Sequence, residues 1–226
     1  MHATSGFTQH TKVVLFDHDG TLIDSEQVHF TLWQHVLSRF DIVLEQTFYN
    51  DVMAGMPELQ NAHDIMREFQ PDTDAASLTA AKNAALDEYL QQQPFPLMPG
   101  AIDAVLRCQR AGLVLGIVTG GGRHSLRRTL QRPELQGVFR VTVAAEDVPE
   151  SKPNPQCYLQ ALHKLGVTAG QAVAVEDTMY GLQAASSAGI ACAVIPTEHS
   201  QDHDFSLASG RFTRLAQWLD KAGVPG

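Results

Sequence analysis

Basic residues, cysteines and long apolar runs are all scarce in this chain of 226 residues. Lys and Arg number 16 against 25 Asp and Glu, a net charge of -9 that argues against nucleic acid or an anionic membrane surface as the main partner. The three cysteines are far apart and odd in number, so neither a disulfide framework nor a CxxC metal site is indicated. No run of 18 apolar residues occurs, and the first 11 residues do not resemble a signal peptide. These absences predict a soluble, cytoplasmic protein.

What the chain does contain is an apolar run that stops on acids. Val13–Phe16 is typical of a strand buried on both faces of a parallel sheet, and it leads directly into Asp17, Asp19 and Gly20. Because side chains alternate along a strand, we expect both carboxylates on the same side. Ligands of open α/β sheets bind at the carboxyl ends of the strands. The two acids are therefore a candidate site for a metal ion or a substrate.

The rest of the pattern indicates a core with a helical insert. Apolar residues recur at helical spacing from about residue 24 to 92, and no strand-like run follows until Leu113. Pro94, Pro96 and Pro99 then indicate a linker back to the core. Beyond residue 100, strands and helices alternate, which favours a doubly wound, Rossmann-like α/β fold with a parallel sheet. The expected strands are 113–118, 138–145, 172–175 and 191–195, and the expected final helix is 211–221. We predict a flexible tail at 1–11, core segments at 12–21 and 99–226, and a helical cap at 22–98.

Further polar residues follow these strands at the same predicted edge. Glu176 and Asp177 would add two carboxylates to the first pair, and such crowded acids repel one another unless a hard divalent cation binds them. Oxygen ligands with open positions suit magnesium. The Thr119 hydroxyl, the Gly120 amide and the positive charge of Lys152 could then bind a phosphoryl group. The pattern predicts a phosphate site built around Mg²⁺.

These clusters, taken in order, resemble the four motifs of the haloacid dehalogenase superfamily. The matching motifs are Asp17-x-Asp19-Gly20-Thr21, Thr119, Lys152 in Ser-Lys-Pro-Asn-Pro, and Glu176-Asp177-Thr178-x-x-Gly181. The resemblance covers nearly the whole chain, and the insert is similar to the small α-helical cap of the phosphoglycolate phosphatase and β-phosphoglucomutase branch. It implies a phosphoric monoester hydrolase, namely a magnesium-dependent phosphatase whose partner is a small phosphorylated metabolite such as a sugar or polyol phosphate.

The resemblance also implies a role for each acid. Asp17 would attack phosphorus, and Asp19 would protonate the leaving oxygen and afterwards activate water. The metal would be bound by Asp17, the Asp19 carbonyl and Asp177, with support from Glu176. The residues expected to bind or stabilise the phosphoryl group are Thr119, Gly120, Gly121, Lys152 and Arg123, the last of which could instead simply begin a helix.

The candidate substrate contacts in the cap are His29, Gly55, Met56 and Lys82. His29 and Lys82 lie at positions similar to those of β-phosphoglucomutase. Glu58, however, stands where that mutase has an arginine for its second phosphate. An acid at this position repels a bisphosphate, which argues against mutase activity.

His18 departs from the family, where its position is usually apolar. Strand alternation directs its side chain away from the two acids, so we expect a structural role.

Three other functions stay open at this stage. A β-phosphoglucomutase-like phosphotransferase would use the same core site. A phosphonate-cleaving relative would need a cap lysine for a Schiff base, yet no lysine occurs between Lys12 and Lys82. A non-catalytic metabolite-binding protein would not need all the catalytic residue types that are present. The sequence indicates neither the particular substrate nor the oligomeric state.

Overall fold

The computed structural model describes residues 4–226, which form two compact units. One unit combines the described residues of Met1–Asp24 with Pro96–Gly226, and the other is Ser25–Phe95. The predicted cap at 22–98 extends beyond the second unit by three residues at each end. No helix among the described residues is long and apolar enough to cross a membrane.

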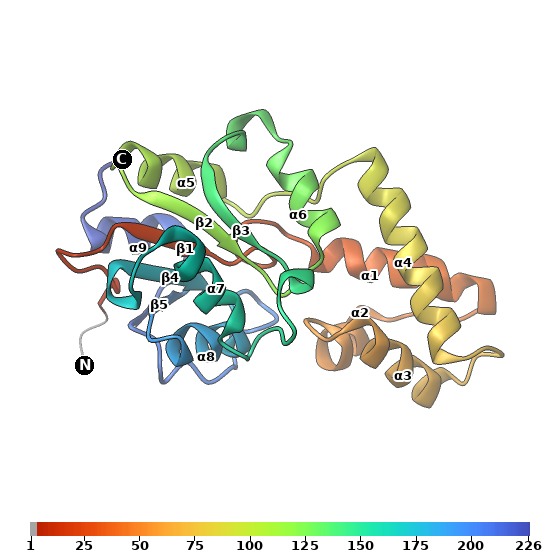
Figure 1. The fold of residues 1–226 in the computed structure, drawn as a ribbon. Helices are drawn as coiled ribbons and strands as arrows, with labels where there is room; N and C mark the ends of the chain where they lie inside the picture. The colour runs from red at the N-terminus through yellow and green to blue at the C-terminus, as the bar shows by residue number, and fades with distance from the viewer. Residues whose placement is uncertain (1–3) are drawn as a thin grey trace. The chain divides into compact units, whose positions relative to one another are not determined.

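The first unit is built on a six-stranded sheet whose neighbouring strands all pair in parallel (Figure 1). Its strand order is β3-β2-β1-β4-β5-β6, so the chain moves outward from β1 first in one direction and then in the other. The switch point therefore lies between β1 and β4. The strands are β1 (Val13–Phe16), β2 (Val114–Val118), β3 (Phe139–Val143), β4 (Ala172–Glu176), β5 (Ala191–Val194) and β6 (Gly210–Arg211). The predicted doubly wound α/β fold is confirmed.

Helices cover both faces of this sheet, as the continuous apolar run of β1 requires. Val14 and Phe16 pack in one buried cluster with Trp218, while Leu15 packs in the other with Tyr158. Each such buried side chain contributes about 1.5–3 kcal/mol. The helices of this unit are α5 (Ala101–Arg110), α6 (Arg123–Leu130), α7 (Gln156–Leu165), α8 (Met179–Ser187) and α9 (Leu215–Ala222).

Residues 4–7, in the segment predicted to be a flexible tail, contact the first unit. Residues 1–3 lie outside the described part, but the Thr4 amide donates to the Ser209 carbonyl at 2.9 Å. The buried indole N–H of Trp218 donates to the Ser5 carbonyl at 2.8 Å, and the Phe7 and Trp218 ring centroids are 5.4 Å apart. A buried indole needs an acceptor, and this segment supplies it. Residues 4–7 are therefore in contact with the first unit, and the flexibility expected for residues 1–11 stays a prediction.

The second unit is entirely helical over its regular elements. Its helices are α1 (Glu26–Leu37), α2 (Gln46–Phe48), which continues as a π-helical turn over Tyr49–Met53, α3 (Glu58–Phe69) and α4 (Ala75–Gln92). The Asp74 carboxylate accepts the Ser77 amide at 2.8 Å and so caps the start of α4. Trp33, Leu37, Tyr49, Ile65 and Leu78 belong to one buried cluster that joins the helices.

Candidate active site

Three neighbouring strands bring the predicted catalytic residues to one edge of the sheet. Asp17 directly follows β1, Thr119 follows β2, and Glu176 is the last residue of β4. The ladder continues past β1, because the Asp17 amide donates to the Val175 carbonyl at 2.9 Å. Parallel pairing in register therefore places these side chains at the same end of the sheet.

Lys152 joins the acids of this edge. Its ammonium donates to Asp17 Oδ1, to Glu176 Oε1 at 2.7 Å and to the Val118 carbonyl at 2.8 Å. Three acceptors use all three of its protons. Tyr158, which sequence reasoning missed, donates from its hydroxyl to Glu176 Oε1 at 2.5 Å. The motif lysine is thus part of the site in the structure.

Burial dominates the electrostatics of the acids. It raises the pKa of Asp17 above its usual range, although Lys152 opposes the shift. It raises the pKa of Glu176 to about 7, again against the charge of Lys152. Burial and the charges of Asp17 and Glu176 together raise the pKa of Asp177 well above its usual value. One ammonium does not compensate three buried carboxylates.

The donor set fits a hard divalent cation. One oxygen each from Asp17, Glu176 and Asp177 lies within 4.8 Å of the others, and all three residues are buried. Glu176 Oε2 is buried without a hydrogen-bond partner. Gly20 has φ +77° and lacks a Cβ, which would otherwise collide with the Asp177 carboxylate. An all-oxygen set with an unsatisfied carboxylate oxygen is suited to such a cation.

The Asp19 carboxylate has a different environment from these three. The Thr119 hydroxyl donates to Asp19 Oδ2 at 3.1 Å and accepts the Gly121 amide at 2.8 Å. A Cβ on Gly121 would lie 2.7 Å from Asp19 Oδ2, so the loop after β2 can approach this close only with glycine. Of the predicted metal ligands, Asp19 is therefore the one whose carboxylate lies outside the three-acid group, and a metal contact through its carbonyl stays a prediction.

The contacts of Arg123 and Gly120 are with residues other than Asp17, Asp19, Glu176 and Asp177. Arg123 is the first residue of α6, and its guanidinium donates to Asp147 at 2.8 Å. Its amide donates to the Glu146 carboxylate at 3.0 Å. Gly120 is exposed, and a Cβ there would lie 3.2 Å from Ser151 Oγ. A phosphate contact by either residue stays a prediction.

His18 is not directed simply away from the acids. It is fully buried, and its Nε2 lies 2.9 Å from the Thr129 hydroxyl oxygen of α6. Its Nδ1, however, lies 3.4 Å from Asp19 Oδ2. The alternation argument is therefore wrong on this point, because the strand ends before His18 and the chain turns there.

The helical unit holds its own polar cluster of Lys82, Glu58 and His29. The Lys82 ammonium is fully buried, donates to Glu58 Oε1 at 2.8 Å and lies 2.9 Å from His29 Nδ1. Burial alone would raise the pKa of Glu58, but the His29 hydrogen bond and the Lys82 charge lower it to about 2. Burial lowers the pKa of Lys82 in spite of Glu58. Two predicted substrate contacts therefore share one acid.

The other two predicted cap contacts lie in the turn before α3. Gly55 has φ +72°, and its amide donates to Glu26 Oε1 at 3.2 Å. Met56 is 40% exposed. The Tyr49 hydroxyl donates to the other oxygen of Glu26 at 2.6 Å. Glu26 was not singled out from the sequence, where only its place at the start of a helix was visible.

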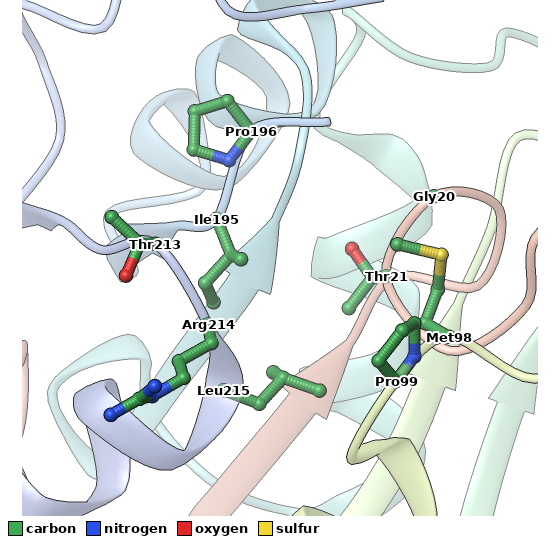
Figure 2. Close-up of a pocket in the computed structure, with 9 residues that line it drawn as sticks. All are labelled: Gly20, Thr21, Met98, Pro99, Ile195, Pro196, Thr213, Arg214 and Leu215. Atoms are coloured by element: carbon green, nitrogen blue, oxygen red, sulfur yellow. The ribbon is translucent and has the colours of Figure 1, made fainter. Parts of the chain in front are cut away.

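A small cavity of about 150 Å³ lies in the first unit beside the loop that follows Asp19 (Figure 2). Its lining is mostly apolar and contains no carboxylate, so it is not the acidic centre. Its lining residues are Gly20, Thr21, Met98, Pro99, Ile195, Pro196, Thr213, Arg214 and Leu215.

The switch point of this doubly wound sheet thus carries a cluster of buried acids that could hold a metal ion and one buried lysine. The haloacid dehalogenase-like hydrolase model matches residues 11–189, and the chain belongs to that family. It is 29% identical to hexitol phosphatase B of Escherichia coli strain K12, over 92% of this chain and 94% of that protein. It is 30% identical to validoxylamine A 7'-phosphate phosphatase of Streptomyces hygroscopicus subsp. limoneus, over 84% of this chain and 88% of that protein.

The fold is likewise similar to that of solved members. CbbY from Rhodobacter sphaeroides, in a complex with xylulose-(1,5)bisphosphate, matches with a TM-score of 0.77 and 25% identity. The match covers 92% of this chain and 96% of the other. Family and relatives together identify the chain as an enzyme, a phosphoric monoester hydrolase.

Proposed function

We propose that this enzyme is a magnesium-dependent phosphatase of a small phosphorylated metabolite, such as a sugar or polyol phosphate, and that it acts through a phosphoaspartyl intermediate on Asp17. The observation that supports this most directly is the bonding of one buried ammonium, that of Lys152, to both Asp17 and Glu176. The hexitol phosphatase and the sugar bisphosphate complex among its relatives support the substrate class.

Each side chain has a defined task in this proposal. Lys152 orients the Asp17 carboxylate for attack on phosphorus and stabilises the transferred charge. Thr119, held by the Gly121 amide, orients Asp19, which protonates the leaving oxygen and later takes a proton from the attacking water. Asp17, Asp177, Glu176 and the Asp19 carbonyl would hold Mg²⁺. Bound magnesium supplies positive charge that stabilises the phosphoryl group during transfer.

The helical unit favours hydrolysis over a bisphosphate-dependent mutase reaction. Glu58 binds the ammonium of Lys82 and, with its low pKa, is ionised throughout the physiological range. The local charge that could attract a second phosphate is therefore already neutralised. A screen of sugar and polyol monophosphates, with bisphosphate-dependent glucose phosphate isomerisation included, would decide between the two reactions. Release of phosphate from a simple aryl phosphate excludes a non-catalytic binding protein.

The two catalytic aspartates provide the direct test. Asp17→Asn removes the nucleophile, so we expect neither turnover nor a covalent adduct. Asp19→Asn keeps the nucleophile but lacks the base for hydrolysis, so the intermediate should accumulate with an aryl phosphate whose leaving group needs little protonation. Intact-protein mass spectrometry after rapid acid quench should show one added phosphoryl group on Asp19→Asn alone. An adduct on Asp17→Asn would contradict the assigned roles.

The metal is tested by binding as well as by activity. Magnesium at a hundred times its Kd should stabilise the protein by about 2.7 kcal/mol, and Asp177→Asn should abolish this gain. The exposed Asp202→Asn variant is the matched control and should keep it. Chelation should stop turnover, and calcium should restore it poorly because its irregular coordination lets Asp17 bind through both oxygens. Full turnover after exhaustive chelation would contradict the proposal.

A further inference from the structure

The residue between the two catalytic aspartates is buried and bonded in a way that its usual apolar counterparts could not reproduce. His18 and Thr129 are both fully buried, and the Thr129 hydroxyl lies 2.9 Å from His18 Nε2. The other ring nitrogen, Nδ1, makes no hydrogen bond of normal geometry, and Asp19 Oδ2 lies 3.4 Å from it. A buried ring N–H without an acceptor is costly, so this orientation needs an explanation.

We propose that His18 is a positioning residue, which Thr129 holds in the tautomer that carries its proton on Nδ1, and which directs that proton to the Asp19 carboxylate. This inference rests on the proposed function, because it concerns the acid–base group of that reaction. It assigns a specific task to a side chain that the family motif does not require.

The surroundings of the Thr129 hydroxyl favour this tautomer, because its buried proton then has an acceptor in His18 Nε2. Thr129 has one hydroxyl proton, and among the described residues the only partner of its side chain is His18 Nε2. A hydroxyl that donates to Nε2 makes this nitrogen the acceptor, and a neutral ring then has its proton on Nδ1. The carboxylate oxygen next to Nδ1 is Asp19 Oδ2, which lies 3.4 Å away and makes no hydrogen bond to it in this structure. Such contacts in catalytic sites are often long before substrate binds.

The effect on Asp19 is to fix one of its two oxygens. Oδ2 accepts from Thr119 at 3.1 Å and lies next to His18 Nδ1, so two groups from different parts of the fold converge on it. A carboxylate held through one oxygen presents the other in a defined direction. Since proton transfer depends steeply on geometry, loss of one support should slow the steps that use Asp19 while leaving phosphate binding intact.

Two substitutions separate this role from mere packing. His18→Asn keeps an amide N–H close to the position of Nδ1 but cannot reach Thr129, whereas His18→Gln reaches toward Thr129 and offers nothing at the Nδ1 position. His18→Leu removes both contacts with an apolar side chain of similar volume, and Thr129→Val removes only the anchor. If His18 has only a structural role, the rates of leaving-group release of the four variants should follow their stabilities. If His18 is a positioning residue, the rate should depend on whether the variant keeps an N–H donor at the position of Nδ1.

The measurement is leaving-group release in a single turnover, over a series of phosphate monoesters from good aryl to poor alkyl leaving groups. For His18→Leu and His18→Gln we expect a loss of about tenfold with the poor leaving groups and less than about twofold with the best, at unchanged KM, as part of the 10²–10⁴ that acid–base catalysis supplies. His18→Asn should recover most of that loss. Uniform losses across the series, or equal losses in His18→Asn and His18→Gln, would overturn the proposal.

A spectroscopic readout checks the tautomer without any activity. Long-range ¹H–¹⁵N spectra of the histidine-labelled protein, compared with those of His18→Asn to identify the signals, should show a protonated Nδ1 and an unprotonated Nε2. The Thr129→Val variant should lose this fixed pattern. The opposite tautomer in the parent protein would overturn the proposal. If the parent releases no leaving group at all, the proposed function fails instead, and the spectrum still decides the role of Thr129.

Discussion

Each of the two units buries a lysine beside acid, and the two lysines differ in a physically informative way. Lys152 in the sheet unit lies against two carboxylates, those of Asp17 and Glu176. Lys82 in the helical unit lies against the carboxylate of Glu58 and the ring of His29. Burial lowers the pKa of both ammonium groups, and the acids around each one raise it, so the final pKa depends on which of the two effects is larger.

The balance between burial and the neighbouring acids decides the outcome. Burial alone would lower the pKa of Lys152, yet Asp17 and Glu176 outweigh it and raise the pKa above the ordinary value. Lys82 forms its ion pair with Glu58, and burial lowers the pKa of Lys82 in spite of that pair and of the additional charge of Glu26. Asp17 and Glu176 thus favour the charged form of Lys152. Burial disfavours the charged form of Lys82, and its charge is paired with that of Glu58.

The largest expected effect comes from removing the core lysine. Lys152→Met should lower kcat/KM by at least about 10³-fold, because it takes away charge stabilisation at the reacting group. It should also destabilise the sheet unit by about 3–5 kcal/mol, since two buried acids are left without their cation. Steady-state kinetics and urea unfolding measure the two losses. Lys164→Met, at an exposed lysine of the same unit, is the control. A similar loss in that variant would show that the effect is not specific to the buried Lys152.

The equivalent change in the helical unit should affect specificity instead of chemistry. Lys82→Met and His29→Ala should reduce efficiency on the natural metabolite by about 10–100-fold, while a small aryl phosphate should lose less than about threefold, because the core still binds its phosphate. Ranking both substrates for each variant gives the answer. Equal losses on the two substrates would assign Lys82 and His29 to folding.

The Glu58 pKa of about 2 predicts acid sensitivity of the helical unit. Because folding depresses this pKa from its usual 4.5, the stabilisation is complete above about pH 4.5 and is lost as the pH falls toward 2. We expect a loss of about 2–3 kcal/mol over this window. The chain has two tryptophans, so in Trp218→Phe the fluorescence of Trp33 reports on the helical unit alone. Glu58→Gln in the same background should be less stable at neutral pH and should flatten the pH dependence.

The smallest expected effect concerns the second acid of the helical unit. Tyr49→Phe removes the 2.6 Å hydrogen bond to Glu26 but keeps the ring in the core. We expect a loss of about 1–2 kcal/mol, as is usual for a hydrogen bond to a charged group. Unfolding followed by Trp33 fluorescence measures it. Tyr49→Phe in a Glu26→Gln background is the comparison; an equally large loss there would show that the charge of Glu26 does not contribute.

Local pattern predicted much of the fold, because burial on one or both faces leaves a periodic trace in a sequence. The apolar run of β1, the alternation after residue 100 and the order of the four motifs were sufficient to predict the doubly wound sheet. The two-residue strand β6 was too short to leave such a trace, and the predicted helix at 211–221 begins only at Leu215 in the structure. The segment at residues 4–7 looked like a tail because its partners, Ser209 and Trp218, lie some two hundred residues away.

The sequence by itself determined which residue types stand at the carboxyl ends of the strands, since a motif is a local order of side chains. Only the tertiary structure decided which of these side chains form hydrogen bonds and ion pairs with one another. The hydrogen bond from Tyr158 to Glu176 and the ion pair of Lys82 with Glu58 depend on how separate elements pack, and the approach of His18 to Asp19 depends on how the chain turns after β1. Such contacts have no period along the chain, so only the folded protein shows them.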